Sequence, residues 1–234
     1  MQKKLRTALK AAFPHTVPVM TGFVFLGMAY GILMSGKGYG WPWILLISGL
    51  VYAGSLQFAG ISLLTAAFDP LYALTIALAV NARHLFYGLS MLEKYSGTGK
   101  LKPYLIFGLC DETFSLLCSV EPPAETERPL FMLAVTMLHQ FYWVLGGLAG
   151  SLIGPLLTFD TRGIDFVMTA FFTVIFINCW RGQKNHFPAL TGLVAAALSL
   201  LVFGAERFII PAMILIIACL TLFRKRFAKE VEQP

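Results

Sequence analysis

Eight apolar runs, separated by short polar breaks, follow one another along this chain of 234 residues. They cover residues 14–35, 41–68, 71–92, 104–120, 130–157, 164–180, 187–203 and 208–223. At about 1.5 Å of rise per residue, 20 helical residues cross a hydrocarbon layer about 30 Å thick, so most runs are long enough to span a membrane. Lipid offers no partner for backbone polar groups and no period-two barrel pattern is present. The runs are therefore predicted to be helices.

The composition excludes a water-soluble globule. The chain is 57% hydrophobic and 13% charged, with a mean hydropathy of +0.73. One soluble core of this size could not bury that much apolar surface, so the lipid bilayer is the expected solvent. The four cysteines are not paired closely enough to suggest a disulfide scaffold.

The net charge of +6 indicates topology rather than nucleic-acid binding, because the basic residues cluster beside apolar runs. The positive-inside rule places both termini in the cytoplasm. We expect a basic arm at 1–12, a single transmembrane transport domain at 13–223 and a tail at 224–234. The terminal clusters are Lys3, Lys4, Arg6 and Lys10, then Arg224, Lys225, Arg226 and Lys229.

The charge of one loop argues against eight simple crossings, which would place Lys94, Lys100 and Lys102 outside. The distribution of basic residues agrees better with the positive-inside rule if runs 41–68 and 164–180 enter the membrane and return to the same side. Six full spans and two halves of opposite topology would then remain. We therefore predict an all-α, polytopic membrane bundle of six to eight spans with broken or re-entrant helices, and an inverted repeat as a hypothesis.

Prolines and small residues in the first two runs fit either close helix packing or broken helices whose freed backbone groups line a cavity. Pro14 and Pro18 lie in the first run, and Gly54 and Ser55 in the second. The sequence leaves both alternatives open.

Polar residues at bilayer depth mark the candidate site. Run 71–92 contains Asn81, Arg83 and His84, and run 104–120 contains Asp111 and Glu112. A charge at the centre of a spanning helix costs about 2.5–3.5 kcal/mol on insertion scales. Both runs leave the same loop, so an antiparallel hairpin would bring Arg83 and Asp111 together about 15 Å into the membrane.

Two interpretations of this cluster stay open. One is a structural ion pair between two helices. In the other, Arg83 or a helix N-terminus binds a substrate carboxylate, and Asp111 or Glu112 binds an ammonium group or couples transport to protons. Tyr87 forms a stripe with Arg83, and Ser55, Gln57 and His139 are weaker candidates for substrate binding or coupling.

No cofactor or catalytic activity is expected. The histidines and cysteines lack metal-binding spacing, and no phosphate-binding loop or GxSxG nucleophile motif occurs. The residues thus favour a transporter for a small amphoteric solute, with a passive channel as the alternative.

Three stretches, VYAGSLQFAG (51–60), VNARHLFYGLSM (80–91) and CDETF (110–114), resemble the AzlC family, also typified by YgaZ. The resemblance implies the large subunit of an exporter of valine, leucine, isoleucine and related amino acids in the cytoplasmic (inner) membrane. It also implies a small AzlD-type membrane subunit as partner. A higher oligomer, the preferred amino acid and the coupling ion stay open.

Overall fold

The computed structural model describes residues 2–65, 69–156, 185–204 and 208–222, with single residues and pairs between 166 and 181. Within these ranges the regular structure is helical and contains no strand, which confirms the predicted all-α class. The chain divides into two compact units, residues 1–168 and 169–234.

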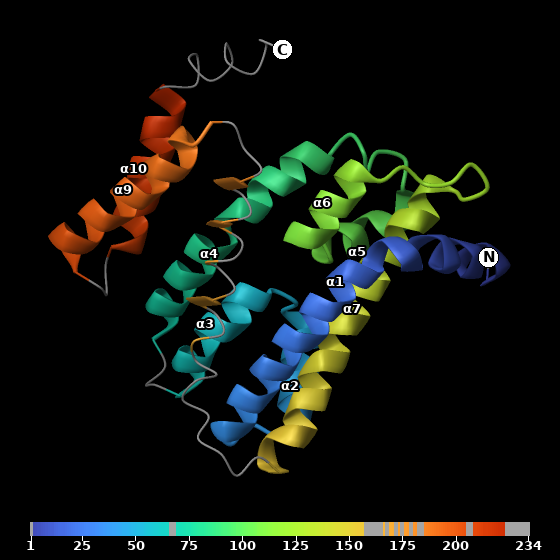
Figure 1. The fold of residues 1–234 in the computed structure, drawn as a ribbon, viewed down its shortest axis with the longest axis horizontal. Coiled ribbons are helices and arrows are strands. Elements are labelled where there is room, and N and C mark those ends of the chain that lie inside the picture. The colour runs from blue at the N-terminus through green and yellow to red at the C-terminus, as the bar shows by residue number, and fades with distance from the viewer. Residues whose placement is uncertain are drawn as a thin grey trace. The chain divides into compact units, whose positions relative to one another are not determined.

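Two long helices, α1 (Gln2–Gly36) and α7 (Arg128–Ile153), lie side by side in the first unit (Figure 1). They run in the same direction. Near their starts Lys4 pairs with Glu127, and near their ends Ser35 Oγ donates to the Ser151 carbonyl at 3.2 Å. We call the end where both helices begin the head end and the other the tail end. In the described ranges these are the two helices long and apolar enough to cross a membrane, with a short 3₁₀ turn extending the second to Leu156.

Glycines bring the α1 and α7 backbones into direct contact. A Cβ added at Gly31 would collide with the Gly147 carbonyl, and one added at Gly150 would collide with the Met28 carbonyl. Pro14 and Pro18 do not break α1, which is continuous from Gln2 to Gly36. The broken-helix alternative is thus wrong for the first run, because packing against α7 compensates for the hydrogen bonds that the prolines remove.

Run 41–68 forms two helices, α2 (Trp41–Leu50) and α3 (Gly54–Thr65), joined at residues 51–53. The first helix runs from the tail end towards the middle of α7, where the Gly49 carbonyl accepts from Gln140 Nε2 at 3.0 Å. The second returns to the tail end, where the Leu64 carbonyl accepts from Tyr39 Oη at 2.7 Å. We call α2 and α3 the first hairpin. Its described residues therefore run from the tail end to the middle of α7 and back to the tail end.

Helix α4 (Pro70–Met91) runs from the tail end to the head end. Asp69 caps its N-terminus by accepting from two backbone N–H groups. At the head end, Met91 and the following Tyr95 join a buried cluster with Ala8 and Ala12 of α1.

Run 104–120 is not one helix. It forms α5 (Lys102–Phe107), preceded by a 3₁₀ turn (Gly99–Leu101), and α6 (Asp111–Ser119). We call α5 and α6 the second hairpin. It enters from and returns to the head end, because Leu105 of α5 and Leu117 of α6 both lie in the head-end cluster.

The predicted antiparallel pairing of α4 with this run is wrong. The two helices run in the same direction, because the chain reverses at residues 108–110, before α6 begins. Three contacts in consecutive order establish this direction: Arg83 with Asp111, Tyr87 with Phe114, and Lys94 with the Leu117 carbonyl.

The second unit contains α9 (Phe187–Phe203) and α10 (Ile209–Leu222), which pack against each other. Gly204 ends α9 with a positive φ of 73°, a conformation that glycine adopts without steric strain. The proposed dip of run 164–180 and the basic tail lie mostly or wholly outside the described residues.

Candidate functional site

Arg83 joins the starts of two helices that belong to different hairpins. Its Nη1 lies 2.8 Å from Asp111 Oδ2, and its Nη2 donates to Ser55 Oγ at 2.8 Å. Asp111 is the first residue of α6, and Ser55 is the second residue of α3. One guanidinium therefore holds the tip of the first hairpin and the tip of the second.

The charges at this point are of both signs. Helix N-termini carry partial positive charge from unpaired backbone N–H groups. Arg83 adds a full positive charge, and Asp111 balances it. The Arg83 and Asp111 side chains are 34% and 27% exposed, so neither charge is sealed in the bundle. Arg83 Nε is buried and has no hydrogen-bond partner among the described residues, which leaves one donor free.

The other predicted residues of α4 and α6 surround this pair. Asn81 Oδ1 is buried without a hydrogen-bond partner in the described ranges, and His84 Nδ1 lies 3.2 Å from the Asn81 carbonyl. Tyr87 stacks on Phe114 at a centroid distance of 4.7 Å. Glu112 follows Asp111 and forms no ion pair with any described residue.

Gln57 lies in a separate buried network rather than beside Arg83. Its Oε1 accepts from Trp143 Nε1 at 2.8 Å, and its Nε2 donates to Ser48 Oγ at 3.2 Å. Gln57 is 3% exposed. Both polar groups of its amide are satisfied, so this side chain ties α3 to α2 and α7.

His139 contacts the start of α6 and is fully buried. Its Nδ1 lies 2.9 Å from Thr113 Oγ1, which lies 3.1 Å from Cys110 Sγ. Thr113 was not among the predicted site residues. A hydroxyl within an apolar helix gives no distinctive pattern, and its partner comes from α7, 26 residues later.

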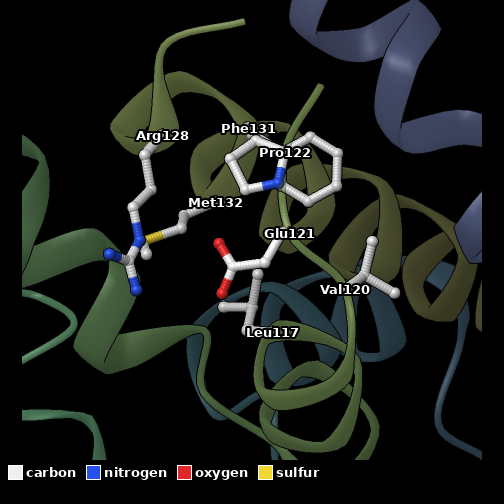
Figure 2. Close-up of a pocket in the computed structure, with 7 residues that line it drawn as sticks. All are labelled: Leu117, Val120, Glu121, Pro122, Arg128, Phe131 and Met132. Atoms are coloured by element: carbon white, nitrogen blue, oxygen red, sulfur yellow. The ribbon is translucent and has the colours of Figure 1, made fainter. Parts of the chain in front are cut away.

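A small pocket lies elsewhere, between the end of α6 and the start of α7 (Figure 2). Its volume is about 10 Å³, room for one water molecule and not for an amino acid. In Figure 2 the Glu121 carboxylate lies near apolar side chains such as Leu117. Among the described residues, no group of three or more His, Cys, Asp or Glu is arranged to hold a metal ion.

The sequence profile of the AzlC protein family matches residues 18–157. The chain belongs to the AzlC family. This confirms the resemblance of its motifs, and the match contains the described hairpins, Arg83 and Asp111. No solved structure matches the chain.

Relatives in the AzlC family cover nearly the whole chain. The Bacillus subtilis branched-chain amino acid transport protein AzlC is 48% identical over 97% of this chain and 90% of its own length. A Haemophilus influenzae membrane protein is 44% identical over 92% of this chain and 88% of its own length. The Escherichia coli inner membrane protein YgaZ is 24% identical over 91% and 88%. The chain is accordingly a membrane protein, which agrees with its many exposed apolar side chains.

Proposed function

We propose that this protein is a multi-pass secondary transporter of the cytoplasmic membrane that exports branched-chain amino acids. The observation that carries the proposal is the position of Arg83, which bonds to the first turn of both α3 and α6. In many secondary transporters the N-termini of discontinuous helices point at an anionic group of the substrate.

A zwitterion fits the charges at this point. Its carboxylate would bind Arg83, and its ammonium group would bind the released Asp111. The substrate would thus insert into the ion pair and leave each charge compensated, so no unpaired charge is created in the membrane. A neutral amino acid satisfies both partners, whereas an amine or a carboxylic acid alone satisfies one.

Preference for branched aliphatic side chains is proposed from the Bacillus subtilis relative, whose name gives that substrate class. Burial of an aliphatic side chain would add about 0.8 kcal/mol per CH₂ group. Asp111 and Glu112 are the proposed proton-coupling groups, and His139 contributes to coupling through the start of α6.

The proposed topology places the head end in the cytoplasm. The first hairpin then enters from outside and the second from inside, so that α1–α3 and α4–α6 have opposite orientations. Lys94 and Lys100 share an end with Glu127 and the basic arm, as the positive-inside rule favours. The 41–68 dip keeps this loop inside. Because runs 41–68 and 104–120 both return to their own side, the other six runs supply six crossings in this proposal, an even number that puts both termini in the cytoplasm.

The test is transport by purified protein in proteoliposomes, alone and together with a small AzlD-type subunit. Vesicles are loaded with labelled leucine, valine or isoleucine, and efflux is measured with and without a pH gradient. Saturable efflux that accelerates when unlabelled substrate is added outside supports a carrier. Non-saturating electrical current would instead support a passive channel, and no flux in either preparation would refute both.

A further inference from the structure

One turn of α7, residues 139–143, contacts all four short helices of the two hairpins. Trp143 bonds to α3 and His139 contacts α6, so each of these two side chains serves one hairpin. Gln140 lies between them in the sequence and bonds to both hairpins, through α2 and α5.

The Gln140 amide joins Gly49 of the first hairpin to Tyr104 of the second. Its Nε2 donates to the Gly49 carbonyl at 3.0 Å, and its Oε1 accepts from Tyr104 Oη at 2.6 Å. A carbonyl can only accept and an amide nitrogen can only donate, so these partners fix the orientation of the amide. Both hydrogen bonds are partly buried, so water does not fully replace a partner that leaves.

The Gly49 carbonyl needs a partner from outside its own helix. Gly49 is the last residue but one of α2, and carbonyls in the last turn of a helix have no partner within that helix. The ladder closes at the Ile47 carbonyl, which accepts from Val51 N at 2.9 Å. Gln140 therefore holds the end of α2 in place from α7.

The two hairpins also touch at their tips, where the two helices of each hairpin meet. The Tyr52 ring lies 6.1 Å from the Phe107 ring. This aromatic contact buries surface without a directional bond. The polar connections between the hairpins come from two other helices, through Arg83 of α4 and Gln140 of α7.

We propose that Gln140 is a positioning residue that couples the two hairpins, so that displacement of one weakens the attachment of the other to α7. When either partner leaves, the amide loses one of the two contacts that fix its orientation. It then makes its remaining hydrogen bond in fewer of its conformations. The inference goes beyond the proposed function, because it concerns how the hairpins move and holds whichever solute is carried.

The test is thiol labelling of the two tips in purified protein, which requires no transport. Cys110 is half-buried at the second tip and is the reporter there, in a background without the other three cysteines. Ala53→Cys is the reporter at the first tip, in a background without native cysteines, and Ala53 is also half-buried. The rate of labelling by N-ethylmaleimide rises with the fraction of time that a tip is undocked.

Tyr104→Phe removes one hydroxyl from the second hairpin. We expect it to raise the labelling rate about fivefold at Cys110 and, through Gln140, about threefold at Ala53→Cys, because a net hydrogen bond is lost. Gln140→Met keeps an unbranched side chain of similar length and removes both bonds, so both rates should rise about fivefold. Adding Tyr104→Phe to Gln140→Met should change neither rate further, since the Tyr104 hydroxyl has already lost its partner.

Tyr142→Phe is the matched control. Tyr142 is 3% exposed on the same helix as Gln140, and its hydroxyl lies 3.0 Å from Thr16 Oγ1 of α1. This variant loses a buried hydroxyl contact that involves neither hairpin. Both labelling rates should stay within about 1.5-fold of wild type.

Two outcomes overturn the inference. A Tyr104→Phe effect confined to Cys110 does so, because the second hairpin then moves without the first. Rates in the double variant that equal the product of the single effects also do so, since the first tip is then reached through other contacts. If Gln140→Met aggregates in size-exclusion chromatography, the reach of Tyr104→Phe to the first tip decides alone. Absence of transport by wild-type protein refutes the proposed function and leaves the labelling result unaffected.

Discussion

Arg83 Nη1 and Asp111 Oδ2 lie 2.8 Å apart, although 27 residues of chain separate them. If this pair binds substrate, Arg83→Ala and Asp111→Asn should each lower leucine efflux at least about tenfold, because each leaves one charged group of the substrate unpaired. Membrane insertion, measured by immunoblot of washed membranes, should remain detectable. Full transport in both variants would reduce the pair to a structural role.

The control for this prediction is the other described ion pair, Lys4 with Glu127, at 2.6 Å. Its side chains are 69% and 56% exposed, so solvent screens their attraction. Glu127→Gln should change efflux by less than about twofold, which separates loss of any ion pair from loss of the Arg83 pair.

Glycine contact between α1 and α7 predicts which small substitutions the fold tolerates. Gly31→Ala and Gly150→Ala place a methyl group against backbone carbonyls that cannot move aside, so each should destabilise the protein by about 3 kcal/mol. Fluorescence-detected size-exclusion chromatography after heating in detergent measures the loss. Gly22→Ala is the matched change, since nothing lies within 4 Å of its Cβ position. Equal stability of all three would contradict the packing.

The side of the 93–101 loop can be determined by cysteine labelling. Ser96 is exposed in this loop and Lys37 is exposed at the opposite, tail end. In a background without the four native cysteines, Ser96→Cys should react with a membrane-impermeant maleimide only after cell disruption. Lys37→Cys should react in intact cells. The reverse pattern would refute the proposed orientation.

The contact between Thr113 and His139 is expected to position Asp111. Both residues are fully buried and their side chains are 2.9 Å apart. Thr113→Val keeps the shape of the side chain but removes the hydrogen bond, so efflux should fall about fivefold. Thr113→Ser should restore it.

Thr136→Val provides the comparison for Thr113→Val. Thr136 is equally buried, yet its hydroxyl donates to Met132 of its own helix and holds no second element. Transport by this variant should stay near wild type. A similar loss in Thr136→Val and Thr113→Val would indicate a general response of the core to valine.

The sequence located the Arg83–Asp111 contact correctly but predicted the wrong direction for the second helix. The two residues are similarly spaced from the loop between them, and α5 with the turn at 108–110 carries Asp111 back to the depth of Arg83. Hydropathy does not reveal that turn, because Leu109 and Cys110 are as apolar as the helical residues on either side of them. The direction of α6 could be determined only from its contacts with α4 and the residues that follow it.

The sequence signals for the helix breaks within the two hairpins differed in strength. Gly54 and Ser55 marked the first as a place where a helix could open, whereas the sequence analysis predicted no break in run 104–120. Thr113 could not be found from its own position. Its hydrogen-bond partner, His139, lies on another helix, and one sequence without its fold does not bring the two together.

The direct backbone contact between α1 and α7 has a consequence for how access could alternate. Where the glycines of α1 and α7 meet, carbonyl oxygens touch the opposite backbone, so the two helices cannot slide or separate there without losing that fit. If the protein works as proposed, α1 and α7 would be the stationary part, and the two hairpins packed against them would be the parts that move. In a transport cycle the first and second hairpins would then rock against this helix pair. Each hairpin would be released when its bond to Arg83 breaks.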